Sequence, residues 1–342
     1  MTLVDTLVFS GGGPDGVAFI GCVRWLEDQG MLSGGGGGSE TAAARPPDHI
    51  DHIRTVVGCS AGAIVALMLA LRMTSREMEA WLRLGVASGD LTEVAVDGLL
   101  LVADRLGVDD GARVLSTLRT LLRERFPSLA AEADGDGFDV TFLQLAKATG
   151  RDLKVGVACL EDARGMLMSV DTSPDLGVLK AVRMSFSVPL LFTPVVHEGR
   201  TYVDGGLFDY CPTQHIESSG AATSTLAVRI TVPPVPPRAP GDPPLDFVSY
   251  ALLLVRAVMM RSSNGRTQRP QAEAAAAAPS PTRVRSVDVP SLLAEGFAGE
   301  REGEGRGRMS FDARSMSLVV PAESIDRYLA HGYDAMNIFS RG

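Results

Sequence analysis

Cysteine, histidine and basic charge are scarce in this sequence, and two of these shortages narrow the range of functions directly. The 342 residues include four cysteines, none in a C-x-x-C pair, so their spacing favours neither a metal site nor a disulfide framework. Thirty-two basic residues stand against 41 acidic ones, which gives a net charge of −9. Nucleic-acid binding needs clustered lysine and arginine to neutralise phosphates, so no nucleic-acid partner is expected.

Long apolar runs are lacking as well. The longest, residues 61–71 and 248–260, fall short of the roughly 20 residues that a membrane-spanning helix requires, and Arg256 interrupts the second. Residues 1–5 are not a basic region leading into the apolar stretch of a secretory signal. We therefore expect no transmembrane segment, a cytoplasmic location, and membrane contact of the peripheral kind only.

What the sequence does contain is an alternation of short apolar runs with helical ones. Residues 3–9 predict a strand, a glycine cluster follows, and residues 17–29 carry apolar side chains at helical spacing. Residues 55–57 predict a second strand, which leads directly into an apolar helix over 60–71. This alternation favours an α/β fold with helices on both faces of a mainly parallel sheet. Further strands are predicted over 153–159, 165–170, 201–203 and 225–231, and further helices over 75–84, 111–125, 141–148, 176–186 and 246–261.

Two segments interrupt this pattern. Residues 33–48 include five consecutive glycines and a Pro-Pro pair, which predict a flexible surface loop. Residues 262–307 are of low complexity and are predicted to be disordered, because such a composition buries too little apolar surface to offset the entropy of ordering. A strand over 315–320 and a helix over 322–339 follow. We therefore expect a single domain over 1–342 with two insertions.

The pentapeptide that follows the second strand is the strongest chemical signal. It reads Gly58-Cys59-Ser60-Ala61-Gly62 and matches G-x-S-x-G between a strand and a helix, the context that a nucleophile elbow requires. A sharp strand-to-helix turn exposes the serine, and the two glycines leave room for the neighbouring backbone. The N–H of Ala61, at the positive end of the helix, then faces an oxygen that gains negative charge.

A second signal is the glycine cluster between the first strand and the first helix, Ser-Gly-Gly-Gly-Pro-Asp-Gly over residues 10–16. Bare backbone here can present amide donors to an oxyanion. It can equally cradle a phosphate, since Gly11, Gly13 and Gly16 match G-x-G-x-x-G. The dinucleotide interpretation needs an acidic residue at the end of a second strand about 20 residues on. That region holds the glycine run 34–38 instead, and a purely structural turn is the remaining interpretation.

The third signal is Asp204, which ends a predicted strand and precedes Gly205 and Gly206. An aspartate in this position projects from a turn. Asp-Gly is common in turns, so the dipeptide alone says little. Its weight comes from its combination with the other two segments.

Together these segments resemble the patatin-like phospholipase family. Residues 1–27 are similar to the family's oxyanion-hole segment, and 58–63 to its nucleophile elbow. Residues 183–194 are similar to its small-residue helix that ends before a proline, and 203–212 to its Asp-Gly-Gly segment. The four matches occur in the family's order and spacing and extend over most of the chain.

The resemblance implies a three-layer α/β/α sandwich and a serine acyl hydrolase that cleaves fatty acyl esters of phospholipids or other lipids. It implies a Ser–Asp dyad, in which Ser60 is the nucleophile and Asp204 takes its proton without a histidine. The oxyanion hole is expected from the N–H groups of Gly12, Gly13 and Ala61, with Gly11 supporting the turn. No metal and no cofactor is implied.

Two features leave alternatives open. The family usually has Arg or Lys where this chain has Asp15, and a carboxylate there opposes developing negative charge unless it caps the following helix. A catalytically weak lipid-binding protein is therefore the second interpretation, and a nucleotide-binding protein that uses the glycine cluster is the third. A conventional triad would require a late histidine, for which His331 is the candidate, although it lies in a predicted amphipathic helix.

Overall fold

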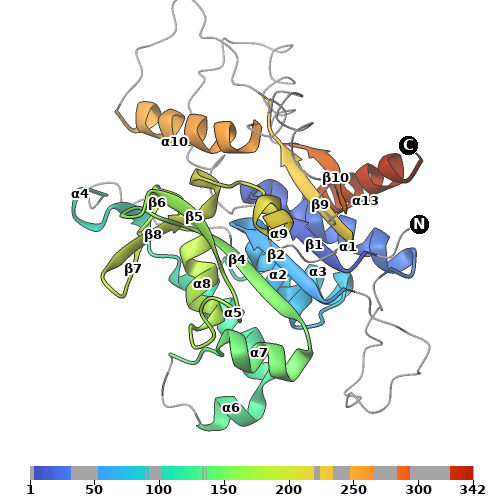
Figure 1. Ribbon diagram of the computed structural model, residues 1–342, viewed down its shortest axis with the longest axis horizontal. Coiled ribbons are helices and arrows are strands. Elements are labelled where there is room, and N and C mark those ends of the chain that lie inside the picture. Colours follow the sequence, from blue (N-terminus) through green and yellow to red (C-terminus); the bar gives the residue numbers. More distant parts are fainter. Residues whose placement is uncertain are drawn as a thin grey trace, which may run out of the picture.

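A computed structural model of the chain describes residues 4–31, 53–89, 91, 102–132, 135, 137–218, 224–233, 247–264, 283–292 and 324–341. Within them, an eight-stranded sheet has the order β10-β9-β1-β2-β4-β8-β7, with β5 also paired to β4 (Figure 1). Its strands are β1 (Thr6–Phe9), β2 (Thr55–Cys59), β4 (Asp152–Cys159), β5 (Arg164–Met168), β7 (Val195–His197), β8 (Arg200–Asp204), β9 (Ser224–Thr231) and β10 (Arg283–Pro290). A separate parallel pair joins β3 (Gly107–Asp109) to β6 (Leu190–Phe192).

Helices cover both faces of the sheet, so the architecture is the three-layer α/β/α sandwich expected from the sequence (Figure 1). β10, β9, β1, β2 and β4 are mutually parallel, while β5 and β8 each pair antiparallel with β4, and β7 pairs antiparallel with β8. The helices are η1 (Gly13–Val17), α1 (Ala18–Asp28), α2 (Ala61–Ala70), α3 (Ser75–Ala87), α4 (Val102–Arg105), α5 (Ala112–Arg125), α6 (Pro127–Glu132), α7 (Phe142–Thr149), α8 (Val178–Ser185), η4 (Gly205–Leu207), α9 (Thr213–Ser218), α10 (Phe247–Asn264) and α13 (Ile325–Arg341). None of the helices in these described ranges is long and apolar enough to cross a membrane.

Successive side chains of β1 point to opposite faces and enter two different cores. Leu7 and Phe9 belong to the large apolar cluster that also includes side chains of α1, α2, α8 and α13. Val8 belongs to a small cluster on the other face, with Val57 of β2 and Ile216 of α9. A strand covered on both faces needs apolar residues at every position, which explains the uninterrupted apolar run at the start of the chain.

Strand register brings distant parts of the chain to one edge of the sheet. Cys59, the last residue of β2, lies opposite Gly156 of β4. β8 runs antiparallel to β4 and ends at Asp204, which lies opposite Val157, the residue after Gly156. The carboxyl ends of β1 and β2 are adjacent at the same edge, where parallel sheets place their ligands. The glycine cluster, the Ser60 turn and Asp204 therefore meet there.

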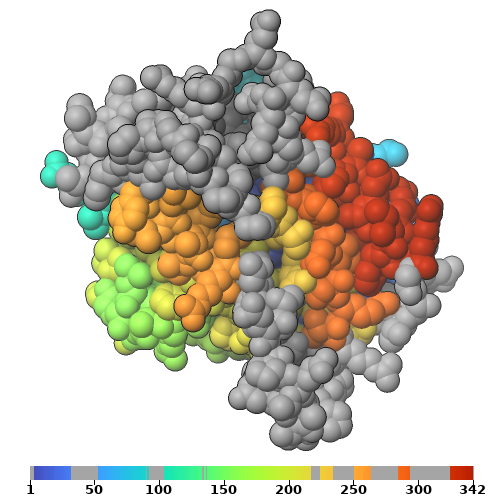
Figure 2. All heavy atoms as spheres, turned by 90° about the horizontal axis from the view of Figure 1, so that it is seen from above, coloured from blue at the N-terminus to red at the C-terminus, as the bar shows by residue number. Residues whose placement is uncertain are grey.

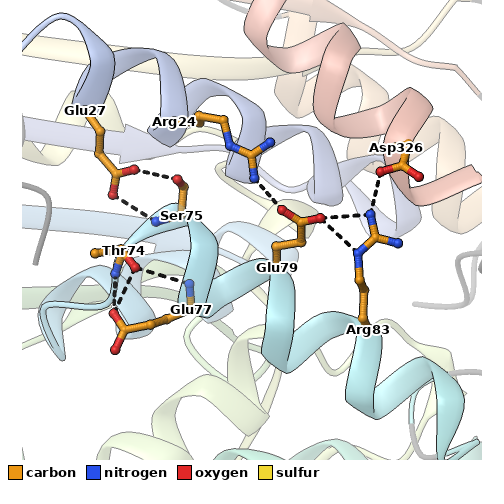
Figure 3. A network of polar contacts seen from close by, with 8 residues as sticks. All are labelled: Arg24, Glu27, Thr74, Ser75, Glu77, Glu79, Arg83 and Asp326. Atoms are coloured by element: carbon orange, nitrogen blue, oxygen red, sulfur yellow. Dashed lines mark hydrogen bonds and ion pairs between the residues drawn. The ribbon is translucent and has the colours of Figure 1, made fainter. Parts of the chain in front are cut away.

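Charged side chains tie α3 to two helices of the same layer (Figure 3). Glu79 of α3 accepts hydrogen bonds from Arg24 of α1 and, at 2.9 Å, from Arg83 of its own helix. Arg83 also pairs with Asp326 of α13. Glu27 of α1 accepts a 2.8 Å bond from the N–H of the first residue of α3. Partly exposed pairs of this kind contribute about 0–1 kcal/mol each, so their main effect is on helix orientation.

Residues 283–292 contradict the prediction that the whole of 262–307 is disordered. Arg283–Pro290 form β10, which pairs in parallel with β9 over its full length. Val287 and Val289 are buried while Ser286 and Asp288 are exposed, the alternation of a strand with one solvated face. The low-complexity sequence on both sides dominates a composition taken over the whole segment, and it masks this short run. The N-terminal end of the segment also differs, since α10 continues to Asn264.

Other predictions fall on residues outside the described ranges. These are the loop over 33–48, the remaining parts of the predicted disordered segment (265–282 and 293–307) and the strand over 315–320. The single-domain organisation over 1–342 stays a prediction.

Candidate active site

Ser60 lies at the turn from β2 into α2, in a backbone conformation that residues with a side chain seldom adopt. Its φ is 54° and its ψ is −125°. Strain of this kind costs about 1–3 kcal/mol and persists only where the surroundings enforce it. A Cβ on Gly58 would collide with the carbonyl oxygen of Gly62, and a Cβ on Gly62 with that of Ser10. The two glycines thus let α2 fold back on β2 and let the glycine cluster lie against the turn.

The backbone of Ser60 is held by a residue of α8. The N–H of Ser60 donates a 2.8 Å hydrogen bond to Oγ of Ser185, whose hydroxyl donates a 2.6 Å bond to the carbonyl of Gly156 in β4. Ser185 is completely buried and Ser60 is only 5% exposed. Ser185 therefore fixes the strained turn to the neighbouring strand.

Asp204 ends β8 and is completely buried. Its Oδ1 accepts a 2.8 Å bond from the N–H of Gly206 and lies 3.9 Å from Sγ of Cys59. Its own N–H donates a 2.9 Å bond to the carbonyl of Ser187. Its Oδ2 accepts no hydrogen bond of standard geometry from the described residues. One oxygen of a buried carboxylate is thus left without a partner.

Burial dominates the protonation of Asp204. Loss of solvation raises the pKa of this carboxyl from its ordinary value to about 6. The Ser60 hydroxyl, the Gly206 N–H and the Cys59 thiol favour the charged form and limit the rise in pKa. An Asp204 carboxylate near neutral pH is therefore both ionised and basic enough to accept a proton from the adjacent Ser60 hydroxyl.

The glycine cluster divides into one occupied and two available amides. The N–H of Gly11 donates a 2.9 Å bond to the carbonyl of Tyr210, so this amide is occupied and holds the turn. The N–H groups of Gly12 and Gly13 donate to no described residue, and neither does that of Ala61 in the first turn of α2. These three amides are available to an anionic oxygen.

Tyr210 connects the glycine cluster to the Asp204 turn; it lies within the segment 203–212, but the sequence indicated no role for it. Its ring fills the space beside both Gly11 and Gly206, where an added Cβ would approach ring atoms to 2.7 Å and 3.3 Å. Its N–H donates a 2.8 Å bond to Oγ of Ser262 in α10. A single buried aromatic side chain therefore sets the spacing of two turns of the site.

Arg183 organises the segment that follows α8. This buried guanidinium donates to the Ser187 hydroxyl, to the Asp110 carbonyl at 2.8 Å, and to the carbonyl and hydroxyl of Thr193 at 2.7 and 2.8 Å. Burial lowers the pKa of Arg183 to about 10, so the side chain stays charged. The carbonyl of Ser187 in turn accepts the N–H of Asp204. Arg183 therefore helps to fix the backbone at Asp204 through Ser187.

Asp15 does not take the capping role that the sequence left open. It is buried, and its carboxylate accepts a hydrogen bond from the Ser291 hydroxyl and a 3.0 Å bond from the N–H of Leu292. It also interacts with the hydroxyl of Tyr328 in α13, whose pKa rises through burial and the nearby negative charge. No side-chain cap is formed at α1. Asp15 instead fastens the chain after β10 to the segment that follows the glycine cluster.

The histidines have contacts away from Ser60 and Asp204. In the described part of the chain, Nε2 of His331 lies 2.7 Å from the Pro290 carbonyl, and Nδ1 of His197 lies 3.0 Å from Nζ of Lys180. Nε2 of His215 lies 3.7 Å from a carboxylate oxygen of Asp209. His49 and His52 lie outside the described residues. The geometry of His331 gives no support to a conventional triad.

The nucleotide interpretation also lacks its second element. β2 ends at Cys59 and not at an acidic residue, so the expected contact to a ribose is missing at that position. The glycine cluster faces the Ser60 turn, as the contact between Gly62 and Ser10 shows. The site is arranged around a serine and an aspartate.

Comparison with known proteins identifies relatives over most of this region. A family model described as patatin-like phospholipase matches residues 7–215. The chain is 23% identical over 209 residues to "Probable lipid hydrolase 463L" of Invertebrate iridescent virus 6, which covers 60% of this chain and 61% of the relative. It is 26% identical over 216 residues to the uncharacterized protein YqhO of Bacillus subtilis, with 60% and 64% covered.

Among solved structures, VipD from Legionella pneumophila is similar to this chain with a TM-score of 0.46 and 15% identity. The match covers 99% of this chain and 67% of that one. The chain spans about three fifths of the length of the curated relatives that it matches.

Proposed function

Because the chain belongs to the patatin-like phospholipase family, we propose that it is a serine hydrolase of fatty acyl esters of phospholipids or other lipids, with Ser60 as nucleophile and Asp204 as general base. One observation carries the proposal. Asp204 is completely buried, its pKa is raised to about 6, and its unpartnered Oδ2 belongs to a carboxylate beside the Ser60 hydroxyl. The relative described as a lipid hydrolase supports the class of substrate.

In the first half of the reaction, Asp204 takes the proton of the Ser60 hydroxyl as Oγ attacks the ester carbonyl. The carbonyl oxygen becomes an oxyanion, which the N–H groups of Gly12, Gly13 and Ala61 stabilise. The bond to the alcohol breaks, the alcohol takes the proton from Asp204, and an acyl ester of Ser60 remains. Asp204 then takes a proton from water, hydroxide adds to the acyl carbonyl, and the fatty acid leaves while Ser60 regains its proton.

The catalytically weak alternative rested on Asp15 as an unfavourable charge at the oxyanion site. Ser291 and Leu292 engage both oxygens of that carboxylate, which favours a structural role for Asp15 over an effect on the oxyanion site. Peripheral contact with a lipid surface is part of the proposal, because an esterified fatty acid in a bilayer is reached from its surface.

Turnover of a p-nitrophenyl acyl ester tests the assignment of the base. We expect Asp204→Asn to lower turnover by at least about a hundredfold, which is the lower end of the contribution of a positioned proton acceptor. His331→Ala is the matched control and should keep turnover within a few-fold. Loss of turnover in a folded His331→Ala protein, with Asp204→Asn active, would replace the dyad by a triad. Lipid profiles produced by the wild type and by Ser60→Ala then identify the ester class.

A further inference from the structure

The solvent side of α10 carries a narrow apolar stripe. Tyr250, Leu254 and Val258 follow one another at intervals of four residues, so they lie on one face of the helix. Their exposed fractions are 52%, 49% and 47%. Figure 2 shows α10 at the surface, in orange to the left of the centre. Single exposed apolar residues need no explanation, whereas three aligned on one helix indicate an interaction surface.

The opposite side of α10 is fixed to the candidate active site. Leu252 and Met259 are buried, and the methyl group of Met259 would lie 2.8 Å from a Cβ on Gly206, two residues after Asp204. Ser262 accepts the N–H of Tyr210, the residue that spaces the two turns of the site. Whatever contacts the stripe therefore lies within one helix diameter of the Asp204 turn.

The charge of α10 is opposite to that of the chain. Residues 247–264 contain no Asp or Glu and contain Arg256 and Arg261, although the chain has a net charge of −9. Arg261 is exposed in the last turn. Arg256 is partly buried, and it donates a 3.0 Å bond to the Pro233 carbonyl. An apolar stripe with the exposed Arg261 near it, on a helix without acidic residues, matches a surface of anionic phospholipid.

We propose that the stripe Tyr250–Leu254–Val258 docks α10 onto an anionic phospholipid surface and thereby brings Ser60 and Asp204 to bilayer-borne esters. The inference rests on the proposed function for the nature of the substrate. A second copy of the chain fits less well, because a stable dimer interface uses about 20–30 residues on each side and this stripe has three.

Vesicle binding tests the proposal with the full-length protein. The probes are vesicles of phosphatidylcholine alone and of an equimolar mixture with phosphatidylglycerol. We expect the wild type to sediment with the mixed vesicles. The triple variant Tyr250→Ser, Leu254→Ser, Val258→Ser should bind them at least about tenfold more weakly, since apolar burial drives binding at the interface. Leu84→Ser and Ile338→Ser are matched controls, because these side chains are 71% and 74% exposed on other helices.

A second variant keeps the test decisive if the triple substitution unfolds the helix. Leu254→Glu places one negative charge at the centre of the stripe and should abolish binding to the mixed vesicles, whereas Leu84→Glu should not. Arg261→Gln should weaken binding to the mixed vesicles and leave any binding to phosphatidylcholine unchanged. The proposal would be overturned if the wild type bound neither kind of vesicle, or if the Leu254→Glu protein bound the mixed vesicles like the wild type.

Soluble ester turnover separates failure of this proposal from failure of the function. The stripe variants should cleave a soluble p-nitrophenyl ester like the wild type and lose turnover only on vesicle lipid. Protein that cleaves the soluble ester but shows no stripe-dependent binding retains its proposed function and loses this surface. Protein that binds vesicles through the stripe but cleaves no ester retains the surface and loses the function.

Discussion

Ser60 and Asp204 meet in a buried setting, in which the Ser60 hydroxyl, the Cys59 thiol and the Gly206 N–H favour the charged form of the carboxylate. Loss of solvation raises the pKa of Asp204 to about 6, and hydrogen-bond donors around it hold that rise in check. A base of this kind accepts a proton only in its ionised form. On the proposed mechanism, Asp204 therefore sets the acid limb of the pH dependence of turnover.

We expect kcat/KM on a soluble ester to rise with pH through an apparent pKa of about 6, because protonated Asp204 is inactive below that value. Cys59→Ala removes a donor that favours the carboxylate, so the acid limb should move to higher pH. Cys22→Ala is the matched control, since Cys22 is equally buried and donates to the Gly332 carbonyl instead. If the apparent pKa of the acid limb were the same in Cys59→Ala as in the wild type, another group would control it.

Ser185 offers a second test at the level of single residues. Ser185→Ala leaves the Ser60 N–H and the Gly156 carbonyl without their buried partner, which costs about 1–3 kcal/mol of stability. We also expect kcat to fall by about tenfold or more with little change in KM, because the strained Ser60 turn loosens. Ser169→Ala, at a buried serine that accepts the N–H of Asp171, should lose stability alone. Equal kcat in the two variants would reduce Ser185 to a structural residue.

The sequence led to Ser60, Asp204 and the glycine cluster because each lies in a local strand–turn context with a recognisable chemistry. It placed Ser185, Ser187 and Tyr210 within two segments that resemble the family, 183–194 and 203–212, but assigned none of them a role. These residues take part in hydrogen bonds with residues far away in the chain. No local sequence pattern marks a buried serine or tyrosine that forms such a hydrogen bond. Their roles follow only from strand register, which local patterns do not determine.

Among the elements, the strand–helix units at the start of the chain match their predicted positions to within a few residues. The apolar run of α2 and the Pro-bounded helix α8 do so as well. β3, β6 and β7 were missed, since each is three residues long and gives no measurable periodicity. β10 was hidden by its low-complexity surroundings. Deleting residues 262–307, which the sequence predicts to be disordered, removes this strand and should lower the melting temperature.

The contact between Asp15 and the residues that follow β10 leads to a prediction about how the elements hold together. Asp15→Ala leaves the Leu292 N–H and the Ser291 hydroxyl unpaired in a buried place, which should lower the free energy of unfolding by about 2–4 kcal/mol. Asp15→Arg should be worse and should reduce turnover, the opposite of what the sequence suggested, because it buries an unpaired charge.

Chemical denaturation measures both Asp15 variants. Asp326→Ala is the control, since that carboxylate forms an exposed ion pair with Arg83 and its loss should cost about 0–1 kcal/mol. A stable and more active Asp15→Arg protein would restore the view that Asp15 opposes the oxyanion.

At the scale of the whole molecule, the site depends on chain beyond the region that the family model matches. That region ends at residue 215, yet β1 lies between β2 and β9 in the sheet, and α13 packs along α1. Gly21 and Gly332 let the backbones of these two helices approach each other, since a Cβ on either would collide with a carbonyl of the other helix. Asp15, beside the glycine cluster, is held by the residues after β10. The C-terminal third thus supports the available amides of Gly12 and Gly13.

The most direct test of the whole account is the position of a covalent adduct. A fluorophosphonate forms a stable bond only with a serine that is activated beside an oxyanion hole. Peptide mapping by mass spectrometry should place a single adduct on Ser60 in the wild type and none in Ser60→Ala. Labelling of Asp204→Asn should be at least about a hundredfold slower. An adduct on another serine, or one that persists in Ser60→Ala, would contradict the assignment of the nucleophile.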